Sequence, residues 1–317
     1  MAQLDFAGQV AIVTGGGRNL GRGYSLELAR RGAAVVVDDI DGEAAASVAG
    51  EIERAGGKAV ASAESVATAE GGAAIVAKAV EEFGTVDILV NNAGNLRAGE
   101  FAGLTLDDFE AVLAVHLGGA FCVTQPAWAV MRERGRGRIV MSGSAAGVYP
   151  EGGYSDYATA KAGIVGLTRA LAAEGRAHGI HVNAILPQAG GSSMTADAAP
   201  IHSLEDARFR GPDAALAPYK SVEAVSPLVM YLCSPECSHT GLILSAGAGW
   251  FGRVFLGLTY GWTAPEPGVP PTAEEVARHF DRIVDPAEYL VPGGASDELQ
   301  HIAARLGLAT TEERRAG

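Results

Sequence analysis

The chain has 317 residues with a formal net charge of −13, and 48% of the residues are hydrophobic. This length allows one large α/β domain or two small ones, and this apolar content is enough for a full core. The acidic balance argues against nucleic acid or an anionic membrane as a partner, so a bound anion needs a local cradle of backbone amides and arginine.

The cysteines and the chain start exclude further classes. Cys122, Cys233 and Cys237 are too few and too irregularly spaced for a disulfide framework, and Cys233-x-x-x-Cys237 lacks a second ligand pair for zinc. Residues 1–5 contain no basic region or apolar core of a signal peptide, and the late hydrophobic run 242–258 is too short to span a bilayer. We expect a cytoplasmic protein with reduced cysteines and no metal site.

The first predicted unit is a strand, a glycine-rich turn and a helix. Residues 10–13 are apolar and β-branched, and the glycines of residues 14–23 let the backbone approach a pyrophosphate at a helix N-terminus. A glycine-rich turn without a ligand is the alternative. The spacing Gly15-x-x-x-Asn19-x-Gly21 differs from Gly-x-Gly-x-x-Gly, but asparagine tolerates a left-handed backbone well, so the turn can form.

The next predicted strand, residues 34–40, ends in acidic residues. An aspartate at that edge accepts both hydroxyls of the adenosine ribose and repels a 2′-phosphate, so Asp39 favours NAD over NADP. Arg18 argues the other way, because a basic residue in the turn can pair with that phosphate. We give Asp39 the greater weight, since an acid at the ribose penalises NADP directly, and expect NAD as the cofactor.

Strands and helices alternate along the chain, which predicts a doubly wound α/β domain with a parallel sheet and right-handed crossovers. Asn91–Gly94 follows one strand, where small and amide side chains can line the adenosine. Residues 188–220 lack clear periodicity, which predicts a mobile lid over a substrate. The expected helices are residues 42–55, 68–83, 106–133, 154–178 and 222–233, and the expected strands are 59–63, 86–90, 138–141, 180–186 and 242–245.

Tyr157 and Lys161 are the candidate catalytic pair. They are four residues apart in a run of good helix formers, so their side chains lie on one face of a helix. An ammonium about 4 to 5 Å away can lower the tyrosine pKa from about 10 by about 2 to 3 units, into the range of a general acid/base. Ser144, after an apolar strand, can hold a substrate oxygen. This spacing also arises by chance, so the pair gains weight only beside a dinucleotide cradle.

The composition changes after Gly249. Five aromatic residues fall within thirteen positions: Trp250, Phe251, Phe255, Tyr260 and Trp262. A Pro-rich linker follows, Thr272 and Glu275 form a capping box that opens a helix, and a second helix is expected from Ser296. We divide the chain into a doubly wound domain, residues 1–249, and a C-terminal extension, residues 250–317. The aromatic run either packs within the extension or walls an apolar pocket or a subunit interface.

These motifs resemble the short-chain dehydrogenase/reductase family in order and spacing, over about residues 5–249. The resemblance implies a Rossmann fold with a seven-stranded parallel sheet and hydride transfer between an alcohol carbon and a nicotinamide. It implies Tyr157 as general acid/base, Lys161 as the residue that lowers its pKa and binds the nicotinamide ribose, and Ser144 as the residue that positions the substrate oxygen. The positions that carry it are Thr14, Gly15, Gly21, Asp39, Asn91–Gly94, Ser144, Tyr157, Lys161 and Asn183.

The resemblance also implies a set of cofactor contacts and a proton relay. The family usually has asparagine at the position of His116, where it holds a water that passes protons from the lysine to solvent. We expect His116 to serve as that relay, with a packed helix histidine as the alternative. The residues expected to bind NAD are Gly15, Arg18, Asn19, Leu20, Gly21, Asp39, Ser65, Val66, Asn92, Ala93, Gly94, Tyr157, Lys161, Pro187, Ala189 and Thr195.

Within the family, the chain is most similar to the (3R)-hydroxyacyl-CoA dehydrogenase units of type 2 multifunctional enzymes. The similarity lies in residues 115–117, 183–190, 193–195 and 247–250. It implies NAD-dependent oxidation of a (3R)-3-hydroxyacyl-CoA of a fatty or steroid side chain, in β-oxidation, by a homo-oligomer. A free steroid or other cyclic alcohol is the alternative substrate, and an inactive dinucleotide-binding sensor is the alternative of another class.

Overall fold

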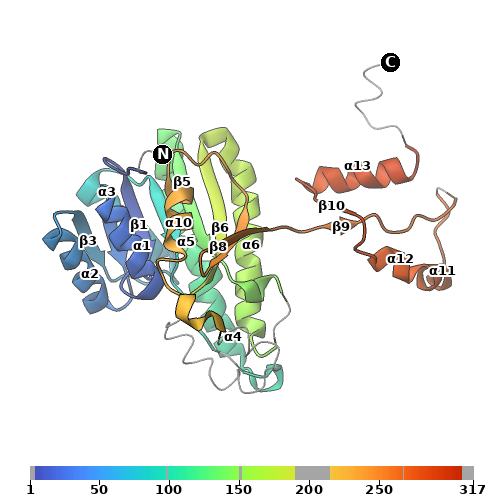
Figure 1. Cartoon of the computed structure of the whole chain (residues 1–317), viewed down its shortest axis with the longest axis horizontal. Helices are drawn as coiled ribbons and strands as arrows, with labels where there is room; N and C mark the ends of the chain where they lie inside the picture. The colour runs from blue at the N-terminus through green and yellow to red at the C-terminus, as the bar shows by residue number, and fades with distance from the viewer. Residues whose placement is uncertain (1–3, 98, 150–151, 190–214, 267, 309–317) are drawn as a thin grey trace, which may run out of the picture. The chain divides into compact units, whose positions relative to one another are not determined.

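The structure is a computed structural model that describes residues 4–97, 99–149, 152–189, 215–266 and 268–308. The chain forms two compact units, Met1–Val254 and Phe255–Gly317. The first unit is built on an eight-stranded sheet in the order β3-β2-β1-β4-β5-β6-β7-β8 (Figure 1).

The first seven strands of this sheet run parallel, which confirms the doubly wound α/β fold. Each strand is a short apolar run, as parallel strands covered on both faces require. The strands are β1 (Val10–Thr14), β2 (Ala34–Asp38), β3 (Lys58–Ser62), β4 (Ile88–Asn91), β5 (Gly137–Ser142), β6 (Ile180–Gln188), β7 (Ile243–Gly247) and β8 (Trp250–Val254).

Helices cover both faces of the sheet. Because successive side chains of a strand point to opposite faces, Val13 and Val37 pack on one side and Ile12 and Val36 on the other. The first side is covered by α1 (Asn19–Arg30), α2 (Gly42–Arg54) and α10 (Ser226–Cys233), and the second by α3 (Ala69–Phe83), α5 (Gly119–Arg134) and α6 (Ser155–Gly175). Two apolar cores result, one on each side of the sheet.

The strand order reverses between β1 and β4. The chain runs outward from β1 to β3 and then returns to β4 on the other side of β1. In doubly wound sheets, ligands bind in the crevice at the carboxyl ends of the strands at such a point. The glycine-rich turn after β1 and residues 91–94 after β4 therefore meet at one edge.

The sheet has one strand more than predicted, and the eighth strand is antiparallel. In register, Gly247 of β7 lies opposite Trp250 of β8, and Ile243 lies opposite Val254. The turn between the two strands consists of Ala248 and Gly249, with φ angles of 52° and 78°. A two-residue loop with both φ positive is the usual hairpin connection. The aromatic run thus begins inside the sheet, and the first unit ends five residues beyond the predicted boundary, at Val254.

Ala248 is in a conformation that disfavours alanine. A left-handed backbone costs an ordinary residue about 1 kcal/mol, whereas asparagine tolerates it. We expect Ala248→Asn to raise the free energy of unfolding by about 0.5 to 1 kcal/mol in urea denaturation. The control is Ala46→Asn on the exposed side of α2, where the same exchange should lower stability. A gain at both positions would contradict this account of the turn.

The described residues of the second unit, 255–266 and 268–308, contain a two-stranded sheet and three short helices. β9 (Leu258–Thr259) pairs with β10 (Tyr289–Leu290), and the helices are α11 (Ala273–Arg278), α12 (Phe280–Val284) and α13 (Ala295–Arg305). The capping box is confirmed, with Glu275 N 3.2 Å from Thr272 Oγ1 and Thr272 N 2.9 Å from Glu275 Oε2. The helix that it opens breaks at His279, so there is one helix more than predicted.

Candidate active site

The glycine-rich turn after β1 is closed by backbone contacts that only glycine allows. Gly15 has a φ of 60°, and a Cβ at Gly21 would lie 2.0 Å from the Gly15 carbonyl oxygen. Asn19 has a φ of 46°, which confirms that asparagine takes the left-handed conformation here. The start of α1 is thereby held directly against the end of β1.

The residues of this turn fit the pyrophosphate of a dinucleotide. No side chain caps the start of α1, and its first turn contains no acidic residue. A helix N-terminus of this kind offers backbone amides and a positive dipole end to a phosphate. Leu20 follows in the first turn of α1 and packs on the core.

Asp39 lies where β2 ends, beside the turn. Its carboxylate accepts hydrogen bonds from the amides of Gly17 and Asp41, both at 3.0 Å. A Cβ at Gly17 would come within 2.9 Å of Asp39 Oδ2, so glycine is needed there. Arg18 forms an ion pair with Asp41. The one basic residue predicted to attract a 2′-phosphate thus has a carboxylate partner in this structure, in an exposed pair.

Asn92 and Thr14 join β4 to the turn. Asn92 Nδ2 donates to the carbonyl oxygens of Thr14 and Gly15 at 3.1 and 3.2 Å. Thr14 Oγ1 accepts from the amides of Asn92 and Ala93 at 3.0 and 3.1 Å. These contacts hold the loops after β1 and β4 together where a ligand would bind.

The other predicted cofactor residues are spread along the same edge. Ser65 Oγ accepts from the amide of Ala67 at 3.3 Å, and Val66 is buried after β3. Pro187 lies at the carboxyl end of β6 opposite Ala246 of β7, with Ala189 just beyond it. Thr195 and most of the predicted lid lie outside the described residues.

Lys161 and Tyr157 are one turn apart on α6. Lys161 is 4% exposed, and its ammonium donates to the Ser142 carbonyl oxygen at 2.6 Å. Its Nζ lies 5.5 Å from the centre of the Tyr157 ring. Burial lowers the pKa of Lys161 to about 7. The structure therefore brings the predicted pair together, and the Lys161 amine is only partly protonated at neutral pH.

Ser144 begins the short helix η3 (Ala145–Gly147) after β5. Its Oγ accepts from the amide of Ala146 at 3.3 Å. A Cβ at Gly147 would lie 2.6 Å from the Lys161 backbone, so η3 packs closely on α6 at the height of the lysine. Because of this close packing, Ser144 lies at the carboxyl end of β5, near the part of α6 that carries Tyr157 and Lys161.

His116 reaches the same place through an irregular helix. The predicted continuous helix 106–133 is instead α4 (Leu106–Leu113), a π-helical turn (Ala114–Gly118) and α5. A π turn adds one residue to the helix and is common at functional sites. An amphipathic pattern does not reveal that insertion, so the sequence predicted one helix.

The His116 ring is buried beside Tyr157 and is held by the loop after β4. It is 3% exposed, and the two ring centres are 5.2 Å apart in an edge-to-face arrangement. His116 Nε2 lies 2.7 Å from the carbonyl oxygen and 3.2 Å from the amide nitrogen of Asn95, so both backbone groups of Asn95 face this ring nitrogen. Burial, with a smaller contribution from Lys161, lowers the pKa of His116 to about 3. The imidazole is therefore neutral at neutral pH.

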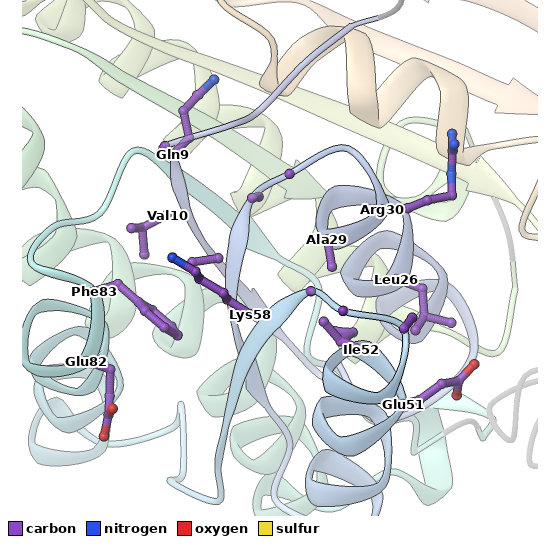
Figure 2. A pocket seen from close by; sticks show the side chains of 17 residues that line it. Gln9, Val10, Leu26, Ala29, Arg30, Glu51, Ile52, Lys58, Glu82 and Phe83 are labelled. Atoms are coloured by element: carbon purple, nitrogen blue, oxygen red, sulfur yellow. The ribbon is translucent and has the colours of Figure 1, made fainter.

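Of two hollows in the structure, the smaller one is lined by predicted site residues and the larger one is not. A cavity of about 10 Å³ lies among His116, Lys161, Asn91, Ser142 and Thr14. A hollow of about 800 Å³ lies at the opposite edge of the sheet, between the amino ends of β1 to β3 and the carboxyl ends of α1 to α3 (Figure 2). It contains none of the predicted site residues, so size alone does not locate the chemistry.

Residues 9–201 match the sequence profile of short chain dehydrogenases. The chain belongs to this family. Short-chain dehydrogenases are oxidoreductases that act on small molecules with NAD or NADP. Neither a group of His, Cys, Asp and Glu suited to a metal ion nor a helix long and apolar enough to cross a membrane occurs among the described residues.

Similar proteins include larger enzymes and single-domain ones. Peroxisomal multifunctional enzyme type 2 of Mus musculus is 41% identical over 291 residues, which are 89% of this chain and 37% of that protein. The full-length structure of the Drosophila melanogaster enzyme of that name matches with a TM-score of 0.78 and 31% identity, over 96% of this chain and 50% of that one. The chain thus spans only a third to a half of the length of these relatives.

A third similar protein was solved with its ligands. 7α-Hydroxysteroid dehydrogenase in complex with NADH and 7-oxo glycochenodeoxycholic acid matches with a TM-score of 0.70 and 29% identity, over 78% of this chain and 98% of that one. That protein thus binds NADH and a steroid acid on the same fold.

The sequence did not single out several residues of this short-chain dehydrogenase site. Ser142 acts through its backbone carbonyl, which leaves no trace in residue type. Asn95 holds His116, and Tyr154 packs edge to face against Tyr157, with ring centres 6.4 Å apart. Thr14 was among the motif positions but not among the predicted site residues, although a hydroxyl where an apolar strand meets a glycine-rich turn can cap neighbouring amides.

Proposed function

We propose that this short-chain dehydrogenase oxidises the 3-hydroxyl of a (3R)-3-hydroxyacyl-CoA to the 3-ketone, with NAD⁺ as the hydride acceptor. The observation that carries the reaction class is the Tyr157–Lys161 pair at the sheet edge that also bears the glycine-rich turn. The resemblance to multifunctional enzymes of type 2, at 41% identity to the mouse protein, supports the substrate class.

Each side chain has a separate task in this proposal. Tyr157 takes the proton of the substrate hydroxyl, and Ser144 holds the same oxygen through its own hydroxyl. The Lys161 ammonium stabilises the phenolate that Tyr157 needs to act as a base. The turn after β1, Asp39 and the loop after β4 would hold NAD⁺, which would supply the acceptor for the hydride of the carbinol carbon.

We assign the proton path to His116. Its Nδ1 has no hydrogen-bond partner among the described residues, and the cavity of about 10 Å³ beside it is lined by the lysine as well. A cavity of that size with several polar walls has room for about one water molecule. A neutral imidazole and that water would lead a proton away from Lys161.

NAD⁺ as the cofactor rests on Asp39 and on the pairing of Arg18 with Asp41. We expect Asp39→Ser to lower the preference for NAD⁺ over NADP⁺, as the ratio of kcat/KM values, by about 10²-fold, because it removes a like charge beside the 2′-phosphate. Asp41→Ser, which frees Arg18, is the matched comparison and should shift the ratio less. A larger effect of the Asp41 substitution would indicate that Arg18, and not Asp39, determines the choice between NAD⁺ and NADP⁺.

A free steroid alcohol is the second candidate substrate, favoured by the similarity to 7α-hydroxysteroid dehydrogenase. Rates with (3R)-hydroxyacyl-CoA and with a 17β-hydroxysteroid at matched concentration separate the two. A higher kcat/KM for the CoA ester supports the proposal. Turnover of the steroid alone would replace the CoA ester as the proposed substrate. NADH binding without activity on either alcohol would favour the alternative of an inactive dinucleotide-binding sensor.

We further propose that the domain predicted for residues 1–249 is the catalytic domain and continues through β8 to Val254, that residues 255–317 are an extension of it, and that the protein is a cytoplasmic homo-oligomer. None of the described residues from 255 to 308 is buried, although the segment carries exposed apolar side chains such as Phe280 and Leu299. A folded unit of this size needs a buried core or a partner surface. Light scattering after size-exclusion chromatography tests the oligomer, and cell fractionation tests the location.

A further inference from the structure

Asp38, the last residue of β2, is a buried acid to which the proposed reaction gives no role. It is 1% exposed, and its Oδ1 has no hydrogen-bond partner among the described residues. Its neighbour in register on β3 is Ser62, which is 4% exposed. A buried carboxyl without a donor for each oxygen is costly to ionise.

Asp38 is tied to the proposed cofactor site through its backbone. Its carbonyl oxygen accepts from the amide of Gly16 at 2.7 Å, and the next residue, Asp39, accepts from the amide of Gly17 at 3.0 Å. The two acids thus support adjacent amides of the glycine-rich turn. Asp39 is partly exposed at the edge, whereas Asp38 is covered. A charge on Asp38 can therefore reach a bound ligand only through its field.

We propose that Asp38 is a second specificity-determining acid, which when ionised adds its charge to that of Asp39 and strengthens the rejection of a 2′-phosphate on the adenosine ribose. This inference rests on the proposed binding of NAD⁺ at the turn. The field of a covered charge is weakly screened by solvent, so Asp38 acts on the phosphate without touching it.

The surroundings of Asp38 make its charge sensitive to pH near neutrality. Burial raises its pKa to about 7, the Ser62 hydroxyl and the Glu64 backbone amide oppose this rise, and the neighbouring carboxylates of Asp39 and Glu64 add to it by smaller amounts. The paired residues on the flanking strands, Thr14 on β1 and Ser62 on β3, are uncharged. The rejection of NADP⁺ should therefore strengthen as Asp38 loses its proton.

The test compares wild type with Asp38→Asn by titrating the apoprotein with NAD⁺ and with NADP⁺. The measured quantity is the dissociation constant of NADP⁺ divided by that of NAD⁺. Between about pH 6 and pH 8.5 we expect this ratio to rise about tenfold more in the wild type than in Asp38→Asn. The 2′-phosphate itself titrates near pH 6, as phosphate monoesters do, but it does so equally with both proteins. Asp39→Asn is the control, which should lower the ratio at every pH and keep the pH dependence.

A second measurement needs no cofactor. Because the folded-state pKa of Asp38 is raised above that of the unfolded chain, the wild type loses stability as pH rises from about 4 to about 7. The midpoint of thermal unfolding of Asp38→Asn should therefore exceed that of wild type by an amount that grows over this range. Asp38→Ser removes the same carboxyl with a smaller side chain and should show the same trend in both measurements.

The outcomes separate this inference from the function on which it rests. Equal pH dependence of the affinity ratio in wild type and Asp38→Asn, with NAD⁺ bound by both, would overturn the role of Asp38 and leave the proposed function intact. Failure of the wild type to bind NAD⁺ at any pH would instead contradict the proposed function.

Discussion

Tyr157→Phe is expected to lower kcat/KM for the alcohol substrate by about 10²- to 10⁴-fold while the affinity for NADH stays within about threefold. The exchange removes one oxygen, the proposed proton acceptor, and keeps the ring that packs edge to face against His116 at 5.2 Å. The fold should therefore survive. Initial rates with NAD⁺ and fluorescence titration with NADH measure the two quantities separately.

Tyr154→Phe is the matched control for this prediction. Tyr154 precedes α6, three residues before Tyr157, and its ring centre lies 6.4 Å from that of Tyr157, so the exchange removes a second phenol oxygen in the same neighbourhood. We expect a change in kcat/KM of less than about tenfold. Comparable activity of wild type and Tyr157→Phe would remove Tyr157 from the mechanism.

Lys161→Met is expected to lower kcat/KM by about 10²- to 10³-fold, since the proposed phenolate loses its cation. Methionine has nearly the length of lysine and no charge. The effect should shrink as pH rises above about 7, because burial lowers the pKa of the ammonium to about 7 and the wild type itself then loses the charge. The pH profile of kcat/KM, measured for both proteins, checks this.

The same substitution should make the protein more stable. The pKa of Lys161 is lower in the folded protein than in the unfolded chain, so its charge opposes folding fully below about pH 7 and ceases to do so as pH approaches about 10.5. We expect Lys161→Met to raise the free energy of unfolding by about 2 kcal/mol at pH 6. Loss of the hydrogen bond from Lys161 to the Ser142 carbonyl oxygen reduces this gain.

Lys58→Met at the opposite edge of the sheet is the control for both effects. Lys58 is exposed and lines the hollow that contains no predicted site residue (Figure 2). Activity and stability should stay close to those of wild type. A Lys161→Met protein that is both active and less stable than wild type would show that the lysine serves packing alone.

Much of the site could be predicted because its residues meet local demands. Gly15 and Asn19 take left-handed backbone angles that few residue types accept, and Tyr157 and Lys161 are brought together by the pitch of one helix. Such constraints act between residues near each other in the chain. They are therefore visible in the order of residue types.

Other parts of the site follow from contacts between distant segments. His116 lies in a π turn that interrupts the predicted helix and faces Tyr157, and its Nε2 is held by the backbone of Asn95 on another loop. Lys161 loses its ordinary pKa because η3 and β5 bury it. No run of neighbouring residues records these contacts.

The sequence by itself determined the doubly wound fold and the glycine-rich turn, and it singled out Tyr157 and Lys161 as the proposed acid/base pair, because apolar strands covered on both faces and tight turns restrict residue type locally. Only the tertiary structure decided that β8 returns along β7, and that Asp38 is covered while Asp39 lies at the edge. The two aspartates are adjacent and chemically identical. What distinguishes them is the direction in which the strand points each side chain, and hence how much water each carboxylate keeps.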